Sequence, residues 1–167
     1  LTDAQLRSVA MLLEAASTNA GTHLLEMPCS GGAVVTQAVA KRITVDTVSF
    51  DERIARGVEE QLIMAGAEGS ARVDLLSSTA EIPELAHQRR GVYDAVVSMN
   101  AFEALPATEQ TAYLQAAEEM LAPGGRVAVQ TIVRTAAYTR AADFAAESLR
   151  AYIWPGLHFA SADQIAK

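Results

Sequence analysis

A glycine-bearing turn follows a short apolar run in residues 24–33, which read Leu-Leu-Glu-Met-Pro-Cys-Ser-Gly-Gly-Ala. The pattern predicts a buried strand, a tight turn and the start of a helix. At such a turn, backbone N–H groups and the positive end of the helix dipole can hold a nucleotide-like ligand. Glu26 ends the predicted strand, where an unpaired buried carboxylate would be costly. We therefore expect Glu26 either to bind a ligand or to cap the loop by accepting hydrogen bonds from its amides.

The residues of the turn differ in what they offer a ligand. Gly31 and Gly32 allow close approach of the backbone, although glycines alone also suit an ordinary strand-to-helix turn. Pro28 removes one N–H donor and fixes φ, while Ser30 retains a hydroxyl but cannot adopt every glycine conformation. Cys29 is expected to be a small packing residue rather than a nucleophile. The G-x-G-x-x-G spacing of nicotinamide-binding turns is absent.

Strands and helices alternate along the rest of the chain and would position this turn. Strands are expected at 23–28, 43–48, 72–76, 93–98 and 126–133, and helices at 2–18, 33–41, 49–66, 81–87, 108–121 and 136–153. Ser49 is expected to cap the third helix, with Glu52 three residues later in a capping-box arrangement. The last helix is expected to pack through one side, formed by Tyr138, Ala141, Ala145, Leu149 and Tyr152. The alternation predicts a doubly wound α/β fold, with helices on both faces of a parallel sheet.

The composition favours one globular domain over residues 1–167. Half of the residues are hydrophobic and the net charge is −7, which gives no electrostatic support for nucleic-acid binding. The basic run Gln88-Arg89-Arg90 is interpreted as a solvated loop. A single cysteine excludes an internal disulfide and a cysteine zinc cluster. The three histidines are scattered, so no metal site is expected.

Cellular location and completeness are also expectations from the sequence. No apolar run approaches the roughly 20 residues of a membrane span, and no signal-peptide pattern opens the chain. We therefore expect a cytoplasmic protein. The chain starts with Leu1 and ends at Lys167 within an apparent helix start. Both ends suggest a fragment of a longer protein.

Further motifs sharpen this interpretation. They are, in chain order, Leu1-Thr-Asp-Ala-Gln5, Tyr93-Asp-Ala-Val-Val-Ser98, Ala101-Phe-Glu-Ala104, Leu121-Ala-Pro-Gly-Gly-Arg-Val-Ala-Val-Gln-Thr-Ile132, Tyr152-Ile-Trp-Pro-Gly156 and Ser161. Over essentially the whole chain, this series resembles the cyclopropane-fatty-acid synthase (mycolic acid cyclopropane synthase-like) family of S-adenosylmethionine-dependent class I methyltransferases. The glycine turns are generic to methyltransferases, whereas the Phe-Glu pair and the Gln-Thr-Ile strand end are more specific to this family.

The resemblance implies a fold and an activity. The sheet would be Rossmann-like, with five mostly parallel strands ordered 3-2-1-4-5 and further strands beyond this chain. The ligand would lie at the carboxyl ends of strands 1, 2 and 4. The implied reaction transfers a methyl (methylene) group from S-adenosylmethionine to the double bond of an unsaturated phospholipid acyl chain. Loss of a proton would then give a ring or a branch.

Two residues are implied to take part in catalysis. Glu103 matches the glutamate that helps the family hold a bicarbonate ion acting as general base. Gln130 stands where many members have a histidine for the same ion. A helix-start glutamate is the structural alternative for Glu103. The implied cofactors are therefore S-adenosylmethionine and bicarbonate.

The resemblance also implies a cofactor-binding set. Glu26 would receive the methionine amino group, and Thr47 the ribose hydroxyls, while Asp46 is a weaker candidate because it faces the opposite side of the strand. Ser78 and Thr79 follow the third strand, where the family usually has an acidic residue near the adenine amino group. The full set is Glu26, Pro28, Cys29, Ser30, Gly31, Gly32, Asp46, Thr47, Ser49, Glu52, Ser78, Thr79 and Asn100.

Two alternatives remain open at this stage. Pro28, Ser30 and the missing carboxylate after the third strand also suit a degenerate methyltransferase fold that acts as a binding module. A small-molecule acceptor is equally compatible with these residues. Otherwise the partner would be an unsaturated acyl phospholipid, met by a peripheral protein at the inner membrane surface, and a homodimer is left open.

Overall fold

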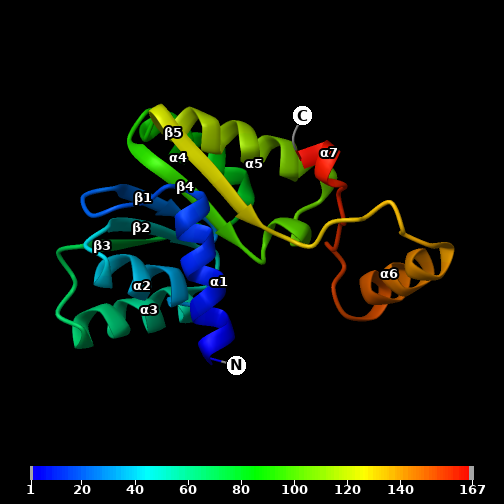
Figure 1. Cartoon of the computed structure of the whole chain (residues 1–167), viewed down its shortest axis with the longest axis horizontal. Coiled ribbons are helices and arrows are strands. Elements are labelled where there is room, and N and C mark those ends of the chain that lie inside the picture. The colour runs from blue at the N-terminus through cyan, green and yellow to red at the C-terminus, as the bar shows by residue number, and fades with distance from the viewer. Residues whose placement is uncertain (1, 166–167) are drawn as a thin grey trace.

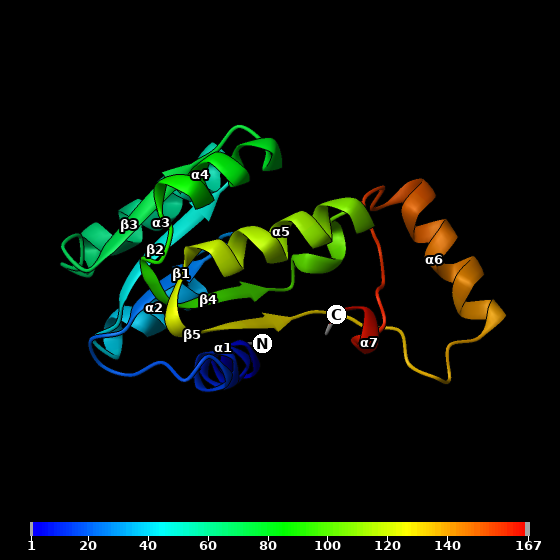
Figure 2. The ribbon, with the colours of Figure 1, turned by 90° about the horizontal axis from the view of Figure 1, so that it is seen from above.

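The computed structural model describes residues 2–165 as one five-stranded sheet with helices on both faces (Figures 1 and 2). The strands are β1 (His23–Glu26), β2 (Thr44–Ser49), β3 (Ala71–Leu75), β4 (Tyr93–Met99) and β5 (Leu121–Gln130). They are all parallel and ordered β3-β2-β1-β4-β5, which confirms the predicted fold class and strand order. All carboxyl ends therefore meet along one edge of the sheet.

Most of the helices lie on one or the other face of the sheet. They are α1 (Thr2–Ala15), α2 (Ala33–Ala40), α3 (Glu52–Met64), α4 (Ile82–Gln88), α5 (Ala107–Met120), α6 (Arg140–Tyr152) and α7 (Ala162–Ile165), with short 3-10 turns at Thr79–Glu81 and Phe102–Ala104. Helices α1, α2 and α3 bury apolar side chains such as Val9, Val35 and Val58 against one face. Helices α4 and α5 cover the other face with Leu85, Tyr113 and their neighbours.

The alternation of side chains along β1 divides the core in two. Leu24 packs towards α1, α2 and α3, whereas Leu25 packs towards α4 and α5, and both are completely buried. Glu26 follows on the same side as Leu24 and is also completely buried. The carboxylate of Glu26 therefore lies at the end of β1, beside the turn that leads into α2.

The start of β5 differs from the prediction. The strand begins at Leu121 rather than residue 126, and its register with β4 jumps from Tyr93↔Leu121 to Ala95↔Arg126. The residues in between form a bulge, in which Gly124 has a φ of +85°. A Cβ at Gly125 would lie 3.0 Å from the backbone oxygen of Asp94, so the backbones of β4 and β5 approach closely there.

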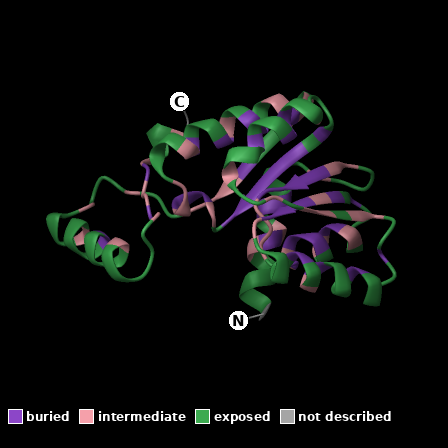
Figure 3. Ribbon diagram, turned by 180° about the vertical axis from the view of Figure 1, so that it is seen from behind, coloured by how far each residue is buried: buried purple, intermediate pink, exposed green. Residues whose placement is uncertain are grey.

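Helix α6 was also predicted incorrectly in part. It begins at Arg140, where the Thr139 hydroxyl accepts a hydrogen bond from the backbone N–H of Ala142, rather than at residue 136. Its one buried residue is Ala146, while Leu149 and Tyr152 of the expected packing side are exposed. Figures 1 and 3 show why, since α6 stands apart from the sheet and is almost entirely exposed. Among residues 2–165, no helix is both long and apolar enough to cross a membrane.

A matched pair of truncations tests this core. We expect Leu25→Ala to lower the free energy of unfolding by about 2–5 kcal/mol, because it leaves a cavity in a completely buried position of the central strand. Leu75→Ala is the control, since Leu75 is 52% exposed and should cost about 0.5 kcal/mol or less. Urea denaturation measures both, and equal losses would contradict this assignment of the core.

Candidate functional site

Glu26 organises the turn between β1 and α2. Its Oε1 accepts hydrogen bonds from the backbone N–H of Ser30, at 2.9 Å, and from the Ser30 hydroxyl. Its Oε2 accepts from the hydroxyl of Thr47 on the neighbouring strand β2, at 2.8 Å. Burial raises the pKa of Glu26, and the bonds from Ser30 and Thr47 oppose that rise. One carboxylate thus ties together the end of β1, the turn and β2.

The turn itself has a defined backbone. Gly31 and Gly32 have φ values of +79° and +95°, a region that glycine enters without strain. A Cβ at Gly31 would meet nothing within 4 Å, so there is open space beside it. A Cβ at Gly32 would lie 2.6 Å from Oε1 of Gln61, so this position also accommodates α3. Pro28 follows a cis peptide bond.

Cys29 lies half-buried at the edge of the core on the α1, α2 and α3 side. Its backbone N–H donates to the carbonyl of Val48, which fixes the turn to β2. Burial and the nearby charge of Glu26 raise the pKa of the Cys29 thiol. A neutral thiol at this position is a poor nucleophile, in keeping with a packing residue.

The structure contradicts the capping box expected at the start of α3. The N-cap is Asp51, whose Oδ1 accepts from the backbone N–H groups of Arg53 and Ile54. Ser49 instead ends β2, and its hydroxyl donates to the carbonyl of Asp51. Glu52 points into solvent and pairs with Arg56 one helical turn later. Asp51 is the cap because it directly precedes Glu52, the first helical residue, so its carboxylate reaches the free N–H groups of the first turn, whereas Ser49 lies two residues further back.

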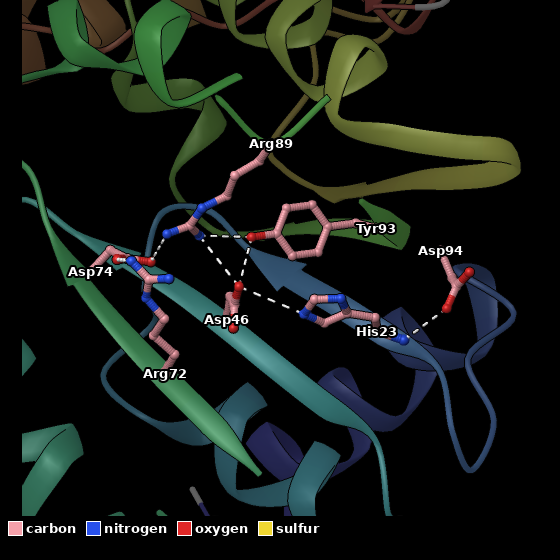
Figure 4. Close-up of polar contacts among 7 residues, drawn as sticks. All are labelled: His23, Asp46, Arg72, Asp74, Arg89, Tyr93 and Asp94. Atoms are coloured by element: carbon pink, nitrogen blue, oxygen red, sulfur yellow. Dashed lines mark hydrogen bonds and ion pairs between the residues drawn. The ribbon is translucent and has the colours of Figure 1, made fainter. Parts of the chain in front are cut away.

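Asp46 belongs to a separate polar network (Figure 4). Its Oδ2 accepts from the Tyr93 hydroxyl at 2.7 Å and lies 3.4 Å from Nη1 of Arg89. Arg89 also donates to Asp74 at 2.7 Å, and His23 lies within ion-pair distance of Asp46. Asp46 and Thr47 are successive residues of β2, so their side chains point to opposite faces of the sheet. Thr47 bonds Glu26, whereas Asp46 points to the face covered by α4 and away from the turn.

This network also corrects the interpretation of Arg89. The guanidinium is largely buried and holds two carboxylates, rather than lying in a solvated basic loop. The sequence run Gln-Arg-Arg does not predict the burial of Arg89, because it is the position of Arg89 at the end of α4 that directs its side chain onto the sheet. Burial and the bond to Asp46 raise the pKa of Tyr93, so its hydroxyl remains a donor at neutral pH.

The loops after β4 and β5 bring the two candidate catalytic residues to the same edge. Glu103 is 2% exposed, and its Oε2 accepts from the Thr131 hydroxyl at 2.7 Å. Gln130 ends β5 and donates through Nε2 to Oδ1 of Asn100, which follows β4. Since β4 lies between β1 and β5, this group is next to the Glu26 turn along the carboxyl edge.

Ser78 and Thr79 lie between β3 and α4, at the same edge. Ser78 is exposed and makes no side-chain cap to the 3-10 turn that follows it. The Thr79 hydroxyl donates to Oε2 of Glu109, in the first turn of α5, at 3.0 Å. Glu109 and Thr131 are not among the residues predicted from the sequence, but each bonds to one of them. Thr131 has a sequence signal, because it directly follows Gln130, whereas Glu109 has none, because α5 alone carries it to Thr79.

Comparison with known proteins completes the description of the site. The family model described as "Mycolic acid cyclopropane synthetase" matches residues 1–167. A tuberculostearic acid methyltransferase of Mycobacterium tuberculosis is 28% identical over 93% of the chain. A ubiquinone biosynthesis O-methyltransferase of Xanthomonas oryzae pv. oryzae is 30% identical over 83% of it. The chain spans 35% and 55% of these relatives' lengths.

Solved structures share the fold. A cyclopropane synthase from Mycobacterium tuberculosis has a TM-score of 0.80 at 19% identity, covering 99% of this chain and 59% of that one. A mycolic acid cyclopropane synthase complexed with SAH and CTAB has a TM-score of 0.77 at 20% identity, covering 98% and 58%. Both chains extend well beyond the length matched here.

The raised pKa of Glu26 predicts a pH dependence of stability. Because the folded state binds this proton more tightly than the unfolded chain, stability should fall as pH rises from the ordinary value of 4.5 through the raised value. Glu26→Gln removes the titrating group. The free energy of unfolding of the unsubstituted protein should therefore decrease relative to that of Glu26→Gln over this window.

Denaturation with urea at a series of pH values between about 4 and 8 measures this difference. A constant offset between the two proteins is irrelevant to the test, which rests on the slope. Glu118→Gln, at an exposed position of α5, should follow the unsubstituted protein throughout. A Glu26→Gln difference that stays constant across the window would contradict the raised pKa.

Proposed function

The chain belongs to the mycolic acid cyclopropane synthetase family, and from this premise we propose that it is part of an S-adenosylmethionine-dependent methyltransferase. The proposed acceptor is the double bond of an unsaturated acyl chain carried by a phospholipid. The observation that carries the proposal is the placement of the buried Glu103, which follows β4, next to the Glu26 turn, which follows the adjacent strand β1 at the carboxyl edge. This is where doubly wound sheets bind their ligands.

The residues of the turn fit the amino-acid end of S-adenosylmethionine. Ser30 donates its hydroxyl proton to Glu26, which leaves the lone pairs of its oxygen for a ligand ammonium group. The Glu26 carboxylate would then be linked to that ammonium group through the Ser30 hydroxyl. The open space beside Gly31 gives the ligand access to the turn. Thr47, the acceptor expected for the ribose, already donates its hydroxyl to Glu26. We place the ribose at the end of β2, near Ser49, on the side of β1 away from β4.

S-adenosylmethionine supplies an electrophilic methyl group attached to a sulfonium. In the proposed reaction, the alkene π electrons form the new C–C bond as the C–S bond breaks, so the acceptor becomes a carbocation. Glu103 is proposed to take a proton from that cation, either directly or through a bicarbonate held with Gln130. Deprotonation of the added carbon closes a ring, and deprotonation of a neighbouring carbon leaves a double bond. Thr131 keeps one Glu103 oxygen occupied and so orients the carboxylate.

Two observations favour other functions. Both Glu26 oxygens already have partners within the chain, as expected if the turn is held for structural reasons in a binding module. One relative is a ubiquinone biosynthesis O-methyltransferase, which supports a small-molecule acceptor. Binding of the cofactor separates the first alternative from the proposal, and the identity of the methylated product separates the second.

Glu103→Gln tests the proposal directly. We expect this variant of the full-length protein to bind S-adenosylhomocysteine within about threefold of the unsubstituted affinity, because Glu103 acts on the acceptor. Methyl transfer to vesicles of monounsaturated phospholipid should fall by about 10²-fold or more, as for loss of a general base. Calorimetry measures the binding, and mass spectrometry of the acyl chains measures the product.

Each part of the proposal has its own contradicting result. Absence of S-adenosylhomocysteine binding at millimolar concentration would exclude the methyltransferase and leave the binding module. Unchanged acyl chains with a methylated quinol or other small molecule would exclude the lipid acceptor. Full activity in Glu103→Gln, with Glu118→Gln as the matched surface control, would remove Glu103 from catalysis.

A second variant tests the orientation of Glu103. Thr131→Val keeps the volume of the side chain but removes the hydroxyl that donates to Glu103. We expect kcat to fall by about tenfold with KM for the lipid little changed, and Thr131→Ser to restore it, since serine keeps the donor. Equal loss in the valine and serine variants would show that the hydroxyl has no part in orienting Glu103.

A further inference from the structure

A pocket of about 350 Å³ lies between α6 and the loop of residues 157–159. Two partly buried arginines, Arg134 and Arg150, line it together with His158. Among residues 2–165, the lining contains one carboxylate, that of Asp143. Two guanidinium groups and one carboxylate give the lining a net charge of +1 with His158 neutral, whereas the whole chain carries −7. Positive charge is therefore concentrated at this pocket.

The two guanidinium groups are not paired with carboxylates in the part of the chain that the structure describes. The ion pairs found there join other residues. The Cζ atom of Arg134 lies 5.7 Å from the centre of the Tyr138 ring, and its Nη2 donates to Oε1 of Gln164 at 3.4 Å. These two contacts orient the guanidinium and leave most of its N–H groups available. Partly buried arginines without a carboxylate partner are suited to binding an anion.

Two segments that form walls of the pocket are hydrogen-bonded to Glu103. The backbone N–H of His158 donates to the carbonyl of Glu103 at 2.7 Å. Thr131, three residues before Arg134, donates its hydroxyl to the Glu103 carboxylate. The two segments run side by side, because the backbone N–H of Arg134 donates to the carbonyl of Ala160 at 2.9 Å. The pocket is therefore built onto the residue that is proposed to act on the acceptor.

We propose that this pocket binds a phosphate group through Arg134 and Arg150, and that the group is the headgroup phosphate of the acceptor lipid. The assignment to the headgroup rests on the proposed function, which takes the acceptor to be a phospholipid. An arginine side chain presents pairs of N–H groups that match two phosphate oxygens. A phosphodiester carries one negative charge, which balances the net charge of the lining. The headgroup would be held here while its acyl chain extends towards Glu103.

The surface of α6 favours a lipid over free phosphate as the source of this group. Phe144, Tyr152 and Ile153 are 60%, 88% and 74% exposed. They belong to α6 and to the residue that ends it, which stand apart from the sheet (Figure 1). A helix that presents apolar side chains beside charged ones is suited to the boundary between lipid headgroups and acyl chains. Free phosphate would make no contact with these apolar side chains.

Vesicles with and without phosphate test this inference on the full-length protein. One set consists of dioleoyl phosphatidylglycerol, and the other of dioleoyl digalactosyldiacylglycerol, which has the same acyl chains but no phosphate. Sedimentation measures vesicle binding, and mass spectrometry measures methylation of the acyl chains. For Arg134→Gln/Arg150→Gln we expect the affinity for phosphatidylglycerol to fall by about tenfold or more, because hydrogen bonds to a charged group are lost. The KM for that lipid should rise in parallel with kcat little changed, and binding to the galactolipid should not change.

A charge-matched variant separates the pocket from general electrostatics. Arg53→Gln/Arg140→Gln removes the same charge from exposed positions of α3 and α6. Its affinity for phosphatidylglycerol should stay within about twofold of the unsubstituted value, because single exposed charges contribute little. Calorimetry with inorganic phosphate at constant ionic strength measures binding of the free ion to the same proteins. Circular dichroism spectra confirm that both double variants are folded.

The outcomes separate the inference from the proposed function. Equal losses in the two double variants, or no loss in either, would overturn the phosphate pocket. Loss of inorganic phosphate binding without loss of vesicle binding would assign the pocket to the free ion and overturn the role of the headgroup. Vesicle binding that requires Arg134 and Arg150, without methylation of any acyl chain, would overturn the proposed acceptor and support the pocket. A loss confined to the pocket variant and to phosphatidylglycerol would support the headgroup assignment.

Discussion

The arrangement of this edge of the molecule depends on one buried carboxylate. Glu26 ends β1 with no solvent contact, so its charge must be balanced by hydrogen bonds from the chain. Ser30 supplies two of them from the turn and Thr47 a third from β2. These bonds hold the turn that contains Gly31 and Gly32 against β1 and β2. The raised pKa of Glu26 shows that their compensation of burial is incomplete.

Buried polar groups occupy two separate parts of the sheet. The Asp46, Arg89 and Tyr93 network lies on the face of the sheet covered by α4 and pairs its charges internally. At the carboxyl edge both oxygens of Glu26 are bonded, whereas Glu103 and Glu109 each bond through one carboxylate oxygen within residues 2–165. Paired charges are suited to fixing a helix on the sheet, whereas free acceptors are suited to a ligand. Asp46 illustrates the difference, because its position in β2 turns it away from the site.

The pairs at the carboxyl edge share one design. Thr131 holds one oxygen of Glu103, and Thr79 holds one oxygen of Glu109. In each pair the threonine and the glutamate are 28 or 30 residues apart and meet only because parallel strands end together. A hydroxyl that occupies one lone pair restricts the rotamer of the carboxylate. Such preorganisation suits a carboxylate that acts on a ligand.

The sequence alone determined the fold class, the strand order expected from the resemblance, and the turn after β1. These follow from local patterns, namely apolar runs, small residues and alternating elements, which do not depend on distant partners. Tertiary structure decided the partners of Glu26, the N-cap of α3, the buried state of Arg89 and the meeting of Thr79 with Glu109. Each of these contacts depends on where the helices begin and how they pack on the sheet. Periodicity indicates which face a residue occupies, but only packing determines what it touches there.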